Sequence, residues 1–169
     1  IHRKVLGDKV LVLGGGRIGK KFCELYSGES LMITSKTQYD YNIVKDYDTI
    51  VIASSPTEKP ILTKQLLENF CGGIVSVSRP SCIDNQALLD AINNGKVSYA
   101  EMDMLNPELR EDLENTGKCK YHKHTAWGND KTAYSDYYFE SLFKEIDLCL
   151  ESKSKNVVLN RTKNVLFGD

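Results

Sequence analysis

The run Val10-Leu11-Val12-Leu13-Gly14-Gly15-Gly16-Arg17-Ile18-Gly19 joins an apolar segment to spaced glycines, and a segment compatible with a helix follows. Between a buried strand and a helix start, Gly14-x-Gly16-x-x-Gly19 is the fingerprint of a dinucleotide-binding turn. We expect Gly14 to allow the tight turn, Gly16 to let a pyrophosphate approach the backbone, and Gly19 to let helix and strand pack closely. The free N–H groups of the helix start would face the phosphates. The alternative is an ordinary glycine-rich turn.

Strand-like and helix-like segments alternate along the rest of the chain. Asp84 is the expected N-cap of one helix, and Gly95 its C′ residue. Only a turn around residues 39–45 is expected between the second and third strands. Repeated strand–helix–strand units predict an α/β fold, a Rossmann-like doubly wound parallel sheet in a three-layer α/β/α sandwich. The expected strands are 9–13, 31–34, 49–53, 74–78, 97–102 and 118–123, and the expected helices are 18–27, 61–70, 84–94, 107–114 and 131–151.

Length and composition narrow the class of protein. The 169 residues suit one domain, a dinucleotide-binding domain over 1–169, with a core of its own. The net charge of −1 does not favour nucleic acid or an anionic membrane as a partner. No apolar run is long enough for a membrane span. Five cysteines without a C-x-x-C pair suit reduced thiols and a cytoplasmic location. The chain begins at Ile1, so we expect it to be part of a longer polypeptide.

Two further blocks carry a resemblance to a known family. One runs from Ser76-Val77-Ser78-Arg79-Pro80 through a helix-like segment to Ala100-Glu101-Met102-Asp103-Met104-Leu105-Asn106-Pro107-Glu108. The other is His124-Thr125-Ala126-Trp127. With the glycine turn, these blocks resemble the D-isomer-specific 2-hydroxyacid dehydrogenases. In that family a strand ends in Arg-Gly, and a Pro-His-Ile-Ala-Trp segment carries the catalytic histidine. The resemblance covers about residues 5 to 159.

The resemblance implies an NAD(P)-dependent oxidoreductase domain. Its reaction would be hydride transfer between a nicotinamide cofactor and a 2-hydroxy or 2-keto acid, and it would form a homodimer. Four features depart from the family pattern. We expect the family's N-terminal substrate domain to lie outside these 169 residues, and Pro80 stands in place of glycine. The segments 34–49 and 56–70 are shorter than usual, and the acidic residue at the end of the second strand is missing.

Three residues are the candidates for catalysis. By resemblance, Arg79 holds the substrate's carboxylate, a task that suits a permanently charged, forked guanidinium. His124 would give a proton to the substrate carbonyl during reduction and take it back in the reverse direction. Glu108 would hold the imidazole in one tautomer. Without the resemblance these would be a loop arginine, a solvated histidine and an acid at a helix start.

The candidate cofactor residues are spread over the strand ends. Asp103 matches the family position that contacts the nicotinamide carboxamide, and Trp127 is more simply a packing residue. Because Thr34-Ser35-Lys36-Thr37 replaces the acid, NADP is favoured slightly over NAD. Cys119, His122 and His124 fit no metal pattern, so no metal is expected. The full set is Gly14, Gly16, Arg17, Ile18, Gly19, Ser35, Lys36, Ser55, Pro56, Ser78, Asp103 and Trp127.

Two other interpretations stay open. The chain could be a nucleotide-binding regulatory or interaction module of the same fold that is weak or inactive in catalysis. It could also carry other dehydrogenase chemistry, on an amino acid or an aldehyde.

Overall fold

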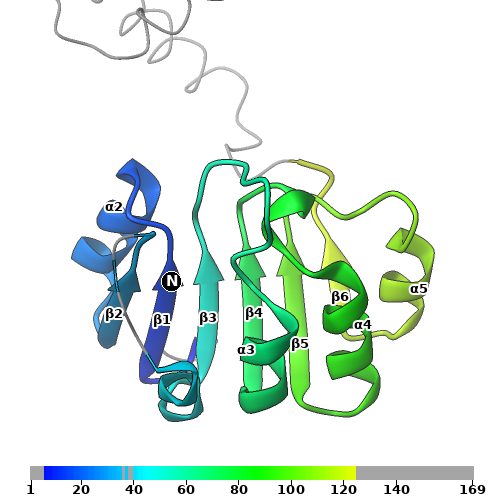
Figure 1. Ribbon diagram of the computed structural model, residues 1–169, viewed down its shortest axis with the longest axis horizontal. Helices are drawn as coiled ribbons and strands as arrows, with labels where there is room; N and C mark the ends of the chain where they lie inside the picture. The colour runs from blue at the N-terminus through cyan, green and yellow to red at the C-terminus, as the bar shows by residue number, and fades with distance from the viewer. Residues whose placement is uncertain (1–5, 36, 38–39, 125–169) are drawn as a thin grey trace, which may run out of the picture. The chain divides into compact units, whose positions relative to one another are not determined.

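The computed structural model describes residues 6–35, 37 and 40–124, which lie in the first of two compact units, Ile1–Ala126. Six strands form one parallel sheet in the order β2-β1-β3-β4-β5-β6 (Figure 1). The prediction of a Rossmann-like α/β fold is confirmed. The expected helix 131–151 lies outside the described residues. The strands are β1 Lys9–Leu13, β2 Glu29–Ile33, β3 Thr49–Ile52, β4 Gly72–Ser76, β5 Val97–Met102 and β6 Cys119–Tyr121.

Helical segments lie on both faces of the sheet. One face carries α2, and the other carries a series of short helices that includes α3 and α4 (Figure 1). No helix in the described ranges combines the length and the apolar character that a membrane span requires. The helical segments are α2 Arg17–Leu25, the 3-10 turn η1 Tyr41–Asp46, α3 Lys64–Asn69, the 3-10 turn η2 Pro80–Cys82, α4 Asn85–Asn93 and α5 Arg110–Asn115.

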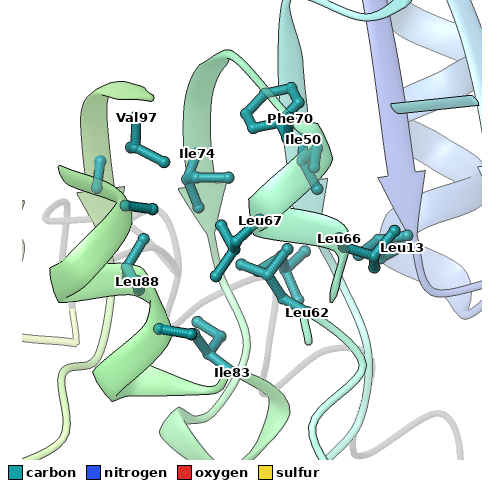
Figure 2. Packing of buried hydrophobic residues seen from close by; sticks show 14 of the residues in the cluster. Leu13, Ile50, Leu62, Leu66, Leu67, Phe70, Ile74, Ile83, Leu88 and Val97 are labelled. Carbon is teal, nitrogen blue, oxygen red and sulfur yellow. The ribbon is translucent and has the colours of Figure 1, made fainter. Parts of the chain in front are cut away.

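The central strands are buried on both sides because alternate residues face two different cores. The smaller core packs against α2 and consists of Leu6, Val10, Val12, Tyr26 and Val51. The larger core packs beneath η1, α3, α4 and α5. Figure 2 shows part of it, including Leu13, Ile50, Leu62, Leu66, Leu67, Phe70, Ile74, Ile83, Leu88 and Val97.

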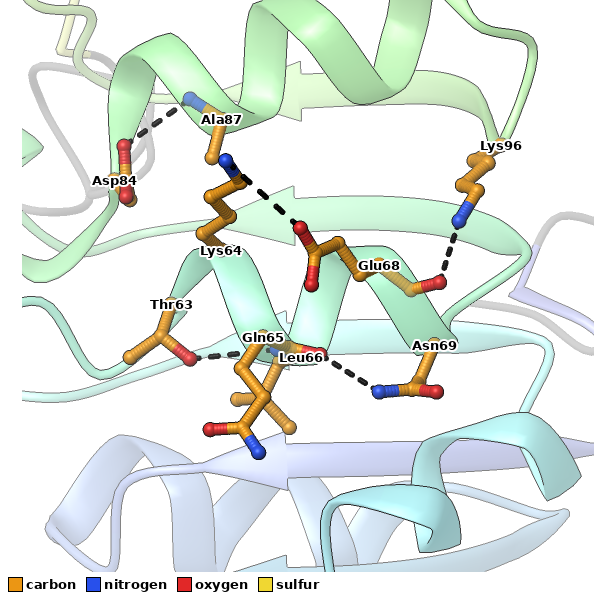
Figure 3. Close-up of polar contacts among 9 residues, drawn as sticks. All are labelled: Thr63, Lys64, Gln65, Leu66, Glu68, Asn69, Asp84, Ala87 and Lys96. Atoms are coloured by element: carbon orange, nitrogen blue, oxygen red, sulfur yellow. Dashed lines mark hydrogen bonds and ion pairs between the residues drawn. The ribbon is translucent and has the colours of Figure 1, made fainter.

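Side-chain caps mark where two of the helices begin (Figure 3). The carboxylate of Asp84 accepts a hydrogen bond from Ala87 N at 3.1 Å, as the sequence predicts. Gly95 follows α4 with φ +73°, the left-handed conformation that glycine adopts without strain. The hydroxyl of Thr63 accepts from Leu66 N at 3.3 Å and starts α3. The prediction of a helix over 61–70 was therefore wrong for its first turn.

The prediction also placed Gly72 and Gly73 in a helix stop, whereas they begin β4. Gly72 N donates to Lys96 O at 3.0 Å, and a Cβ at Gly73 would overlap the ring of Tyr99. Close packing across the sheet requires these glycines. In sequence, a glycine pair that follows a helix-like segment resembles a helix C-cap, which explains the wrong prediction. Other element ends differ from the predictions by a few residues.

In the described part of the link from β2 to β3, the only helical segment is the 3-10 turn η1. The chain runs from β1 to β2 on one side and returns to β3 on the other side of β1. The direction in which strands are added therefore reverses between β1 and β3. In open parallel sheets, ligands bind outside the carboxyl ends of the strands at such a point.

Candidate functional site

The turn after β1 is built on glycines that the fold requires. Gly14 has φ +123°, and its N–H donates to Ile33 O at 2.9 Å. A Cβ at Gly14 would lie 2.5 Å from Ala53 O. A Cβ at Gly19 would overlap the carbonyl oxygen of Gly14, so only glycine allows α2 to pack this close to β1.

Gly16 differs from its neighbours because the protein does not require a glycine there. Its φ is −74°, and an added Cβ would find Ala53 O at 4.0 Å as its nearest neighbour. The first backbone bond of α2 is donated by Lys20 N to Gly16 O at 3.0 Å. The amides of Arg17, Ile18 and Gly19 therefore precede the helical bonding pattern, and no side chain caps them. Open space beside these N–H groups suits an anion.

A groove of about 800 Å³ opens at the carboxyl ends of β1, β2 and β3. Four predicted residues line it: Gly14, Ser35, Ser55 and Pro56. Lys20 is the one charged residue among the described residues of the lining, and it is a cation. Leu13 and Gly15 from the glycine run, and Thr34 and Thr37 from the stretch after β2, also line the groove. The other lining residues were not predicted, because no motif marks them: Lys20, Met32, Ile33, Tyr41, Ser54, Thr57, Pro60, Ile61 and Thr63.

The loop after β2 presents hydroxyls to this groove. Thr37 Oγ1 accepts from Thr34 N at 3.1 Å and lies 3.1 Å from Thr34 Oγ1, while Thr37 N donates to Thr34 O at 3.0 Å. Ser35 lies within the resulting turn. The nearby carboxylate of Asp40 accepts from Asn42 N at 2.9 Å and is not part of the groove. Lys36 lies outside the described residues.

Ser78 faces a neighbouring loop. It is 2% exposed, and its hydroxyl accepts from Ser54 N at 2.8 Å. The single hydroxyl proton of Ser78 has two acceptors within reach, Ser54 O at 2.8 Å and Ile52 O at 3.2 Å, of which Ser54 O is the nearer. Ser78 does not line the groove, so its contribution there is to hold Ser54.

Arg79 is exposed at the carboxyl end of β4. Its backbone is extended, with φ −101° and ψ 154°, as a following proline requires. Pro80 occupies the first position of η2, where its fixed φ is compatible with the turn. Within the described part of the chain, Arg79 makes no ion pair.

The carboxylate beside His124 is that of Asp103. His124 N donates to Asp103 O at 2.7 Å, and His124 Nε2 lies 4.0 Å from Asp103 Oδ2. Asp103 is 5% exposed, and its own N–H donates to Ser76 O at 2.9 Å. Glu108 is exposed and makes no hydrogen bond or ion pair with His124 in the region the structure describes. Among the described residues the carboxylate nearest to His124 therefore follows β5, and the pairing of Glu108 with His124 stays a prediction.

The end of β6 carries a second imidazole–carboxylate contact, between His122 Nε2 and Glu101 Oε2. Lys123 and His124 have φ values of +53° and +60°, in the left-handed region. No metal-binding group of His, Cys, Asp or Glu occurs among residues 6–35, 37 and 40–124. Trp127 lies outside the described residues.

The predicted site residues that are described share one edge of the sheet. Each follows the carboxyl end of a strand: Gly14 to Gly19 follow β1, Ser35 follows β2, Ser55 and Pro56 follow β3, Ser78 and Arg79 follow β4, Asp103 and Glu108 follow β5, and His124 follows β6.

Comparison with known proteins adds to this geometry. No family model matches the chain. The chain is 31% identical, over 134 residues, to a Saccharomyces cerevisiae protein that carries the name 2-hydroxyacid dehydrogenase, covering 64% of this chain and 34% of that protein. It is 25% identical, over 166 residues, to a D-lactate dehydrogenase of Streptococcus pyogenes, and this match covers 78% of this chain and 50% of that protein. The matches thus span half or less of these relatives.

Solved structures agree in fold. A D-lactate dehydrogenase of Lactobacillus jensenii with NAD+ has a TM-score of 0.70 at 16% identity, covering 87% of this chain and 54% of that one. An acyclic imino acid reductase in complex with NADPH and D-Arg has a TM-score of 0.75 at 19% identity, covering 92% of this chain and 55% of that one. At these identities the likeness shows the fold alone. In sequence the chain is thus similar to proteins named 2-hydroxyacid dehydrogenase and D-lactate dehydrogenase, and in fold it is similar to a solved D-lactate dehydrogenase.

Proposed function

We propose that this chain binds a nicotinamide dinucleotide at the carboxyl edge of its sheet and serves hydride transfer between that cofactor and a 2-hydroxy or 2-keto acid. The observation that carries the proposal is Gly16. Neither its backbone conformation nor its packing needs a glycine, while the space beside it faces uncapped amides at the start of α2. A pyrophosphate is the ligand that makes use of both features.

The groove supports the same ligand. Its only described charged residue is the cation Lys20, and its walls combine hydroxyls with apolar side chains. Cofactor sites are commonly of this kind, apolar with a few placed polar groups. The related D-lactate dehydrogenase and 2-hydroxyacid dehydrogenase names suggest the substrate class.

The catalytic roles follow from the groups at the neighbouring strand ends. The bound nicotinamide would supply or accept the hydride. Arg79, unpaired in the described residues and exposed, would hold the substrate carboxylate. His124 would protonate the carbonyl oxygen in reduction and take the hydroxyl proton in oxidation. Asp103 would orient the imidazole, since it lies beside Nε2. The role of Glu108 stays a prediction.

For the cofactor itself we propose NADP in slight preference to NAD. The turn of Thr34, Ser35 and Thr37 offers hydroxyls, and the described lining contains no carboxylate that would repel a 2′-phosphate. We further propose a homodimer as the working form, as the family resemblance implies.

Titrating the chain with NADH and NADPH by calorimetry tests this proposal. Both should bind, with NADPH the tighter ligand, and each should raise the melting temperature because ligands that bind only the folded state stabilise it. Turnover of a panel of 2-keto acids would then be measured with the preferred cofactor. Absence of binding by either dinucleotide would contradict the proposal, and a clear NADH preference would contradict the choice of NADP.

A nucleotide-binding module without catalysis is the second candidate. It is favoured by the separation of Glu108 from His124 in the described contacts. Replacing His124 by alanine distinguishes the two functions. A hydride-transfer enzyme would lose turnover and keep cofactor affinity, whereas a binding module would keep its whole function.

A further inference from the structure

The loops that follow β3 and β4 are joined near the sheet by one buried side chain. Ser78 Oγ accepts from Ser54 N at 2.8 Å and lies 2.8 Å from Ser54 O, to which it donates. Ser54 and the two residues after it form part of the groove lining. A single hydroxyl from the loop after β4 therefore contacts the wall of the cofactor groove through both backbone polar groups of Ser54, its N–H and its carbonyl.

The same two loops are joined again farther from the sheet. Cys82 Sγ donates to Ser55 O at 3.4 Å, and Cys82 O accepts from Ile61 N at 2.9 Å and from Leu62 N at 3.0 Å. Asp84 N donates to Leu62 O at 2.9 Å. Cys82 and Leu62 are fully buried, which shields the bond between Leu62 N and Cys82 O from solvent.

Arg79 lies between these two junctions. Its carbonyl accepts from Cys82 N at 3.0 Å, and the ring of Pro80 fixes the backbone after it. The backbone of Arg79 is therefore restrained on both sides, while its side chain is exposed. Because the backbone of Arg79 is already ordered before a ligand arrives, only its side chain has to be ordered on binding, which lowers the entropic cost.

We infer that Ser78 is a positioning residue that ties the Arg79 loop to the wall of the cofactor groove, so that the guanidinium and the dinucleotide are placed relative to each other. This inference rests on the proposed function and deepens it. It gives Ser78 an indirect part in cofactor binding, exerted through Ser54, in place of direct contact with the cofactor.

The test compares Ser78→Ala with Ser78→Thr, which keeps the hydroxyl. Ser81→Ala is the local control, because Ser81 is exposed in the same loop and its hydroxyl makes no hydrogen bond with the described residues. Thr49→Ala is the stability control. Thr49 is 1% exposed, and its hydroxyl donates to Leu6 O at 2.8 Å at the opposite end of β3.

Three quantities are measured on the 169-residue chain: amide exchange of Ser54, the mobility of the Arg79 backbone amide and Nε–H by NMR relaxation, and NADPH affinity by calorimetry. For Ser78→Ala we expect Ser54 exchange to rise at least about tenfold, Arg79 to become more mobile, and NADPH to bind about fivefold more weakly, as loss of one buried hydrogen bond implies. Ser78→Thr should restore all three, and Ser81→Ala should leave all three unchanged. Thr49→Ala should lower the melting temperature without changing Arg79 mobility.

Equal behaviour of Ser78→Ala and Thr49→Ala would overturn the inference, because a loss of stability alone would then explain the data. Wild-type NADPH affinity in Ser78→Ala would overturn it as well. Failure of the wild-type chain to bind any dinucleotide would instead remove the proposed function. Ser54 exchange and Arg79 mobility would still decide whether Ser78 couples the two loops.

Discussion

Gly14, Gly16 and Gly19 occupy one motif for different physical reasons. Gly14 needs a positive φ, and Gly19 needs the absence of a Cβ where α2 approaches β1. Gly16 needs neither, since its φ is −74° and its surroundings are open. Because the fold does not require a glycine at position 16, this is the residue at which we expect a substitution to affect ligand binding more than folding.

Replacing Gly16 by alanine should therefore mainly weaken ligand binding, whereas replacing Gly19 should mainly destabilise the fold. Gly16→Ala should cost less than about 1 kcal/mol of folding free energy, since alanine is a poorer N-cap than glycine. It should weaken NADPH binding at least about tenfold, because the methyl group enters the space of the pyrophosphate. Gly19→Ala should destabilise the fold by about 1–3 kcal/mol through overlap with Gly14. Urea unfolding measures the folding free energy of each variant, and calorimetry measures its NADPH affinity. Unchanged NADPH affinity in Gly16→Ala would contradict the proposal that the pyrophosphate lies beside Gly16.

The imidazole of His124 offers a second test at this scale. Asp103→Asn should shift the imidazole NMR resonances of His124 at fixed pH, because Asp103 Oδ2 lies 4.0 Å from Nε2. Glu108→Gln should leave them in place. The chain has three histidines, so His124→Ala suffices to assign the signals. The reverse pattern would show that Glu108, the partner expected from sequence, is the true one.

Among the elements, α4 is the best specified by its own sequence. Its N-cap and its terminal glycine coincide with the sequence prediction. By contrast, α3 begins later than predicted because Ile61 and Leu62 extend along the neighbouring loop, where Leu62 forms a bridge with Ile83. Local apolar spacing cannot distinguish a helical turn from an extended segment that is buried by a loop distant in sequence.

Removing the cap of α4 should destabilise the protein measurably. Asp84→Ala leaves Ala87 N without its acceptor and should cost about 1 kcal/mol of folding free energy. Asp90→Ala is the matched control, since the exposed carboxylate of Asp90 accepts only from the side chain of Gln86 in the described contacts. Its cost should stay within about 0.5 kcal/mol. Equal midpoints for both variants in urea unfolding would argue against the cap.

At the scale of the whole molecule, the parallel sheet brings groups from distant parts of the chain to one edge and buries others beneath its helices. Cys119 on β6 belongs to the larger core and is 7% exposed. Burial raises the pKa of its thiol from 9.0 to about 11, and the carboxylates of Glu114 and Glu101 act in the same direction.

This raised pKa predicts how stability depends on pH. Between about pH 9 and 11 the unfolded chain loses the Cys119 proton while the folded chain keeps it, so the free energy of unfolding should fall as pH rises through this window. Cys119→Ala should reduce that fall, whereas Cys71→Ala, at an exposed cysteine, should not. Urea unfolding at pH 8, 9, 10 and 11 measures the effect. An identical pH profile in Cys119→Ala would refute it.

The amino-acid order alone was enough to predict the strand–helix alternation, the glycine turn and the cap at Asp84. Each of these depends on neighbours within a few residues, where spacing and side-chain type act directly on the backbone. The candidate catalytic residues were named through the resemblance to a known family, and the topology of a parallel sheet agrees with them, because every strand points its carboxyl end to the same edge.

Which side chains pair with one another at that edge could be read only from the tertiary structure. Asp103 lies beside His124, and Ser78 holds Ser54, because the register of the strands places these residues together. Strand register depends on how two cores pack on opposite faces of the sheet, and no short stretch of sequence encodes that packing. Contacts between residues far apart in sequence are therefore a property of the tertiary structure.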